Sequence, residues 1–193
     1  MPNISQKWLN SLDVLTPFTR DYSSGIYASE ISRKIKVPQK TVHRKIELLV
    51  KNHFLNYTRE GKNKNYYLDL DKKFSFTILS MVENYKELDF ISKHPDLSIM
   101  FNEIPGTFIL FGSHAKGIAK KTSDIDLIII GKENEKVNKL INKYPFEVNI
   151  LYFTLTEFKE LLRKEEHLAK EVIKDHIIFG EKEKIINLFK KWK

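Results

Sequence analysis

The chain contains 193 residues, of which 41% are hydrophobic and 12% aromatic, enough for one large core or two small ones and too many for wholesale disorder. Cysteine is absent, which excludes disulfides, thiolate metal sites and cysteine nucleophiles. The N-terminus shows no charged leader followed by an apolar run, and the longest apolar runs are far too short to span a bilayer. These features predict a cytoplasmic protein with no membrane partner.

The formal net charge is +8, and it is unevenly distributed along the chain. Residues 1–70 hold 12 Lys and Arg residues against 6 Asp and Glu, whereas residues 71–193 hold 21 against 19. An excess of positive charge in the first third is what a partner such as nucleic acid would require. The alternative is a lysine-rich surface that is simply well solvated.

Apolar residues recur at helical spacing in the first third of the chain and predict helices at residues 6–15, 28–36 and 39–52. Pro38 separates the second helix from the third, because the residue before a proline avoids the helical region and proline suits a first helical turn. Two short strands are expected at residues 54–57 and 66–68. They flank residues 59–65, a polar segment with Gly and Asn that is typical of a hairpin tip.

This order of helices, tight turn and basic hairpin resembles the winged helix-turn-helix class of transcription regulators over about residues 5–70. The resemblance implies that the third helix enters the major groove of double-stranded DNA, where its side chains reach phosphates and base edges. The residues expected to be exposed there are Gln39, Lys40, Thr41, His43, Arg44 and Lys51. On the wing, Arg59, Lys62 and Lys64 would contact phosphates or the minor groove. The other use of such a domain is protein contact or dimerisation.

Residues 71–95 are expected to connect this domain to the next. Apolar residues at near-helical spacing predict one helix over residues 74–94, and His94-Pro95 stops it. We expect its aromatic face to pack in the core and between the domains. Packing of a homodimer is the functional alternative.

The pattern changes at residue 107. Residues 107–111 form an apolar run typical of a buried strand, which ends at Gly112-Ser113 and leads into a short helical segment up to residue 121. A second strand is expected over residues 123–130. Ten residues separate Ser113 from Asp124, and Asp126 follows after one more.

These residues have the chemistry of a metal and phosphate site. Side chains alternate across a strand, so Asp124 and Asp126 project to the same face. Such a pair needs a counter-charge, which Mg²⁺ supplies while it also binds substrate phosphates. Gly112 lets the backbone approach a phosphate, to which Ser113 and the first helical amides can donate. Lys116, and also Lys120, lie near enough to neutralise a triphosphate.

Two apolar strands carry a Gly-Ser pair that is followed, after ten residues, by Asp-x-Asp. This pattern resembles the signature of the polymerase-β-type nucleotidyltransferase superfamily, especially its small prokaryotic members. The resemblance covers about residues 96–180 and implies two Mg²⁺ ions, with ATP or another nucleoside triphosphate as substrate. Asp124 and Asp126 would bind the metals and act in catalysis, while Gly112, Ser113, Lys116 and Ser123 would bind the nucleotide. The overall prediction is an α+β chain with a winged helix-turn-helix domain (1–70), a connector helix (71–95) and a small mixed-sheet nucleotidyltransferase domain (96–193).

The superfamily adds a third carboxylate on a neighbouring strand, and here the sequence departs from the pattern. The candidate strand covers residues 146–153, on which Glu147 and Asn149 share one face. Glu147 is the favoured third metal ligand and catalytic residue, since it reaches further than the usual Asp. Asn149 is the alternative, as a neutral and weaker ligand.

The resemblance implies an enzyme that transfers a nucleoside monophosphate, AMP from ATP in the first instance, to a protein or small-molecule acceptor. The small prokaryotic members include antitoxin-like proteins that modify a partner toxin, and a winged helix would suit such a protein if it also represses its own operon. A second hypothesis is a DNA-binding regulator whose transferase domain only senses nucleotide. A third is an aminoglycoside-type transferase, against which the basic N-terminal domain argues.

Overall fold

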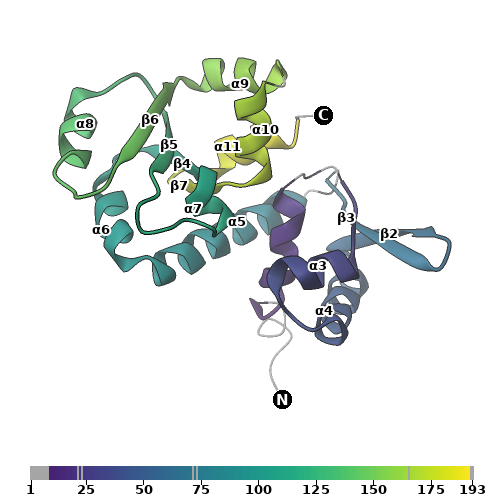
Figure 1. The fold of residues 1–193 in the computed structure, drawn as a ribbon. Coiled ribbons are helices and arrows are strands. Elements are labelled where there is room, and N and C mark those ends of the chain that lie inside the picture. The colour runs from purple at the N-terminus through teal and green to yellow at the C-terminus, as the bar shows by residue number, and fades with distance from the viewer. Residues whose placement is uncertain are drawn as a thin grey trace. The chain divides into compact units, whose positions relative to one another are not determined.

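A computed structural model describes residues 9–20, 22, 24–70, 72, 74–164 and 166–191 (Figure 1). The chain forms two compact units that divide between Tyr85 and Lys86, inside the long helix α5 (Ser75–Lys93). The expected connector helix over residues 74–94 is therefore present. Along the described residues, no helix combines the length and the apolar character needed to cross a bilayer.

The first unit opens with short helical turns, α2 (Leu12–Leu15) and the 3-10 helix η1 (Thr16–Thr19). Part of the expected first helix, residues 6–8, lies outside the described residues. Two amphipathic helices follow, α3 (Ala28–Ile35) and α4 (Gln39–Lys51), and bury Ile31, Val42 and Ile46 in the core of this unit.

The turn between α3 and α4 is fixed by its own hydrogen bonds. Lys36 adopts a left-handed conformation with φ 55°, which ends α3. Ser32 forms two hydrogen bonds with Val37, the residue after Lys36. The Ser32 carbonyl accepts from the Val37 amide at 3.2 Å, and the Ser32 hydroxyl donates to the Val37 carbonyl at 2.7 Å. Pro38 directly precedes α4. The proline-centred break that the sequence predicts is present.

A three-stranded antiparallel sheet completes the first unit. Its order is β1-β3-β2, built from β1 (Ile26–Tyr27), β2 (Leu55–Glu60) and β3 (Asn63–Leu68). The hairpin is longer than the sequence suggested, because Arg59 pairs with Lys64 and Glu60 with Asn63. Only Gly61 and Lys62 remain for the turn, and Gly61 has the positive φ (63°) that a two-residue hairpin loop requires. The prediction of a loop over residues 59–65 is therefore wrong.

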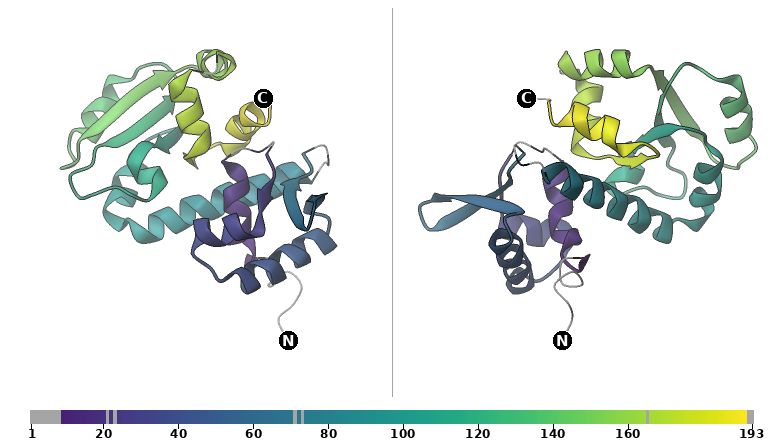
Figure 2. Two further views of the ribbon diagram at one scale, coloured as in Figure 1. Left: turned by 45° about the vertical axis from the view of Figure 1, so that its right-hand side comes forward. Right: turned by 180° about the vertical axis from the view of Figure 1, so that it is seen from behind.

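The second unit is built on a four-stranded mixed sheet of order β6-β5-β4-β7 (Figures 1 and 2). The central strand β4 (Thr107–Phe111) runs antiparallel to both β5 (Ile125–Ile130) and β7 (Ile177–Phe179), whereas β6 (Val148–Phe153) runs parallel to β5. The mixed sheet is as expected, although β5 starts two residues later than predicted.

Helices surround this sheet. They are α6 (Pro95–Glu103), α7 (Gly112–Lys116), α8 (Glu135–Ile141), α9 (Leu155–Arg163), α10 (His167–Lys174) and α11 (Lys182–Phe189). Pro95 does stop α5 as predicted, but it also occupies the first position of α6, a place where proline's missing amide costs nothing. The sequence patterns described above predict none of α6, α8 and α11.

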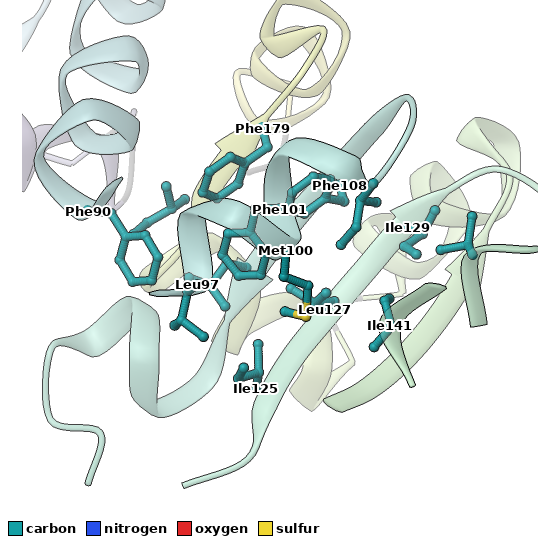
Figure 3. Close-up of a cluster of buried hydrophobic side chains, with 14 residues drawn as sticks. Phe90, Leu97, Met100, Phe101, Phe108, Ile125, Leu127, Ile129, Ile141 and Phe179 are labelled. Carbon is teal, nitrogen blue, oxygen red and sulfur yellow. The ribbon is translucent and has the colours of Figure 1, made fainter. Parts of the chain in front are cut away.

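The core of the second unit lies between the sheet and α6, joined by the end of α5 (Figure 3). Phe108 is fully buried and stacks on Phe179 with ring centroids 4.6 Å apart, while Phe101 meets Phe108 edge-on at 5.3 Å. Burial of each such ring contributes about 1.5–3 kcal/mol. Ile109 and Ile128, which point to the opposite face of the sheet, are also buried. Burial on both faces explains why these strands read as continuous apolar runs.

Candidate active site

The candidate site lies where β4 ends, beside the start of β5 and β6. The strand registers pair Phe111 with Asp126, and Asp126 with Asn149. The chain leaves β4 directly into α7 through Gly112. Three elements that are distant in sequence therefore converge on Asp126.

Gly112 is packed against the Asp126 carboxylate. Its φ of +67° is one that residues with a side chain rarely adopt, and a Cβ at this position would lie 2.2 Å from Asp126 Oδ2. The backbone conformation therefore favours glycine, and a side chain at this position would displace the Asp126 carboxylate. The Gly-Ser corner and the second aspartate, separated in sequence, are in direct contact in the fold.

The two aspartates are turned toward a common point. The side-chain amide of Asn149 donates to Asp126 Oδ1 at 3.1 Å and makes a longer contact of 3.5 Å with Asp124 Oδ2. Asp124 is exposed and Asp126 is half-buried, with the fully buried Ile125 between them. A single small amide can reach both carboxylates only if they lie side by side.

Of the two candidates for the third position, Asn149 is the one whose side chain has described contacts with the aspartates. Glu147 precedes β6 and is exposed, and its backbone carbonyl accepts from the Ile125 amide at 2.8 Å. Within the described part of the chain, no three acidic or histidine side chains lie together in a way that could hold a metal. The parallel register explains the choice, because it places Asn149 directly opposite Asp126.

Lys116 is held by a residue that the sequence did not single out. Its Nζ atom forms an ion pair of 2.6 Å with Oε1 of Glu171, on α10. The hydrogen bond to Glu171 raises the pKa of Lys116, and the charges of Glu171, Asp175 and Asp126 act in the same direction. Lys116 therefore lies within the electrostatic reach of Asp126. Lys116 and Glu171 are 55 positions apart in the sequence, so no local pattern could predict this pair.

The loop between α7 and β5 is closed by Ser123 and His114. The Ser123 hydroxyl accepts from the Lys120 amide at 2.9 Å, and its carbonyl lies 3.2 Å from His114 Nε2. Ser113 is half-buried in α7, and its carbonyl accepts from the Ile118 amide at 3.1 Å. Ser123 therefore shapes the loop that carries Asp124.

The side chains present fit a divalent cation. Two adjacent carboxylates supply hard anionic oxygens. If the terminal amide group of Asn149 rotated by a half-turn, its oxygen would take the place of its N–H groups and offer a third oxygen ligand. The amide now occupies the place between the carboxylates that a cation would take. Gly112 leaves room at Asp126 that any larger residue would fill.

A comparison with known families agrees with this geometry. Residues 95–191 match the model of the nucleotidyltransferase domain, and the chain therefore belongs to that family. No curated protein and no solved structure matched. The family supports nucleotidyl transfer as the general activity, in which a nucleoside triphosphate and a divalent metal take part.

A second group of predicted site residues lies in the first unit. Gln39, Lys40, His43 and Arg44 are exposed on α4, and Thr41 is half-buried. On the hairpin, Arg59 and Lys62 are exposed, whereas the ammonium of Lys64 lies 4.3 Å from the centroid of the Tyr57 ring. Lys45, also on α4, pairs instead with Asp13 at 2.6 Å.

Proposed function

We propose that residues 86–192 form a Mg²⁺-dependent nucleotidyltransferase that moves a nucleoside monophosphate, AMP from ATP in the first instance, to a protein or small-molecule acceptor. The observation that carries the proposal is the shared contact of Asn149 with Asp124 and Asp126, beside the Gly112 corner. Two carboxylates that face a phosphate-binding corner are the arrangement that in-line phosphoryl transfer needs.

Each residue of the site has a proposed role. Asp124 and Asp126 would hold two Mg²⁺ ions, and Gly112, Ser113 and Lys116 would hold the triphosphate. The bound metal supplies charge neutralisation and Lewis acidity at the phosphates. In the reaction, the acceptor oxygen forms a bond to the α-phosphorus, the bond from that phosphorus to the bridging oxygen breaks, and pyrophosphate leaves. Lys116 provides the positive charge that the chain itself can place near the leaving group.

The first unit is proposed to bind double-stranded DNA as a winged helix-turn-helix. Support comes from the tight turn between α3 and α4 and from the two-residue loop of the β2–β3 hairpin. Exposed polar and basic residues on α4 and on the hairpin support it as well. Joined to a transferase, this unit suggests an antitoxin-like autoregulator, with a toxin as the protein acceptor. A homodimer would suit a two-fold symmetric operator.

One observation favours a second function. Asn149 is neutral where the superfamily resemblance implies a carboxylate, so the site has one negative charge fewer with which to hold metal. A regulator that binds DNA and only senses nucleotide is therefore the alternative.

The experiment uses ATP labelled either at the α- or at the γ-phosphate, with Mg²⁺ and a lysate or the product of an adjacent gene. Label from the α-phosphate should appear on an acceptor, and label from the γ-phosphate only in pyrophosphate. The Asp124→Asn/Asp126→Asn variant should lose transfer. Glu147→Gln is the matched control, since Glu147 is exposed and makes no described side-chain contact with the aspartates; it should keep full transfer. ATP binding without transfer would overturn the enzyme and support the sensor.

A further inference from the structure

The ion pair between Lys116 and Glu171 joins α7 to α10, two helices of the second unit that are labelled in Figure 1. Lys116 is the last residue of α7, the helix that begins at Gly112. Gly112 is the residue packed against Asp126. The two ends of this five-residue helix therefore carry the residue packed against Asp126 and the ammonium group bound by Glu171.

Three carboxylates act on this ammonium group. Glu171 accepts its hydrogen bond, while Asp175 and Asp126 act on it through their charges. Asp175 is buried, whereas Asp126 is half-buried and Glu171 is partly exposed. If Glu171 were neutral, the charges of Asp175 and Asp126 would still act on Lys116, and the less buried of the two is Asp126, a proposed metal ligand.

A lysine on Asp126 would harm the site twice. A positive charge there competes directly with a divalent cation, and an ammonium drawn to Asp126 leaves the position in which Glu171 would hold it for phosphate oxygens. Bound to Glu171, Lys116 uses one of its three N–H donors and keeps two. The side chains of the pair are 33% and 28% exposed, so the pair by itself adds little to stability.

We propose that Glu171 is a positioning residue of the transferase site, which holds the Lys116 ammonium away from Asp126. Asp126 then remains available to a divalent cation, and Lys116 to the phosphates of a nucleotide. This inference rests on the proposed function, and it assigns to α10 a task in the site that the sequence motif does not contain.

The test measures two bindings separately, Mn²⁺ without nucleotide by electron paramagnetic resonance, and ATP in EDTA by calorimetry. Glu171→Gln should weaken Mn²⁺ binding by about tenfold, the usual effect of losing a residue that orients a metal ligand. It should also weaken metal-free ATP binding by about threefold, since a charge-assisted hydrogen bond to phosphate is lost. Loss of one negative charge alone would have the opposite effect on ATP, because a less negative site attracts an anion more strongly.

Two further variants isolate the role of Lys116. In Lys116→Met/Glu171→Gln, no ammonium remains to occupy Asp126, so Mn²⁺ affinity should return to within about twofold of wild type while ATP binding stays weak. Lys116→Met alone should weaken ATP binding and leave Mn²⁺ binding intact. Thermal unfolding of each variant shows whether the fold is kept.

The outcomes separate this inference from the proposed function. If Glu171→Gln binds Mn²⁺ as wild type does, or binds metal-free ATP more tightly, the role of Glu171 is overturned. The proposed function survives that result provided that Asp126→Asn still abolishes Mn²⁺ binding. A wild-type protein that binds no Mn²⁺, or an Asp126→Asn variant that binds it normally, overturns both.

Discussion

The contact between Gly112 and Asp126 gives the sharpest prediction, because a second glycine supplies a matched control. Gly112 and Gly117 stand at φ +67° and φ +69°, at the two ends of α7. A Cβ at Gly112 would lie 2.2 Å from Asp126 Oδ2, whereas a Cβ at Gly117 would have nothing within 4 Å. The two alanine variants therefore share the backbone strain and differ in the clash.

Each alanine should lower the free energy of unfolding by about 1–2 kcal/mol, the cost of a left-handed conformation for a residue with a side chain. The clash adds little to this cost, because the atom that it meets is the end of a side chain that can rotate. It must, however, move the Asp126 carboxylate from its position beside the Gly-Ser corner. Gly112→Ala should therefore lose Mn²⁺ affinity by at least about tenfold, and Gly117→Ala should keep it.

Urea unfolding gives the stability of the two variants, and Mn²⁺ titration gives their metal affinity. Similar losses of stability together with a loss of metal binding in Gly112→Ala alone would support the reasoning. Equal metal affinity in the two variants would refute it. Such a result would mean that Asp126 binds the metal equally well after the alanine has displaced its carboxylate.

Three further predictions concern separate features. Asn149→Asp should melt at a lower temperature than wild type without divalent cations and gain more from added Mg²⁺, because a third carboxylate adds repulsion to the empty site and affinity to the filled one. The Thr154 hydroxyl lowers the pKa of Glu157 below its ordinary value of 4.5. A lowered pKa stabilises the fold above the unfolded value, so Thr154→Ala should be less stable than wild type at pH 7, and this difference in thermal unfolding should shrink as the pH falls through the folded pKa. Arg44→Ala should weaken DNA binding and reduce its salt dependence by about one unit of slope, whereas Arg163→Ala, with the same loss of charge on α9, should bind in gel-shift titrations as wild type does.

Much of the site could be predicted because local patterns determine it. Apolar runs marked β4 and β5, and alternation along a strand placed Asp124 and Asp126 on one side. The Gly-Ser corner was predicted in the same way, from its place at the end of an apolar run. These features depend on neighbours in the chain, for which periodicity and spacing carry the information.

The remaining features depend on register and on long-range contacts. Alternation put Glu147 and Asn149 on the same face and could not choose between them, since the choice is made by the pairing of Asp126 with Asn149. Glu171 reaches Lys116 from α10, and no spacing rule links the two. Helix α6 was missed because a proline that ends one helix can also begin the next.

The neutral Asn149 has a consequence for how metal and nucleotide bind. In the absence of a cation, its amide donates to both aspartates and so relieves their repulsion without adding a third negative charge. A cation that displaces those contacts must therefore obtain further oxygen ligands from elsewhere, and the phosphates of a nucleotide are the ligands that Mg²⁺ commonly uses. Metal and triphosphate should then each raise the affinity for the other by the same factor, as thermodynamic linkage requires. Under this reasoning the site is filled by a metal–nucleotide complex more readily than by either component alone. The enzyme and the sensor share that property, and they differ only in whether an acceptor oxygen can reach the α-phosphorus once the complex is bound.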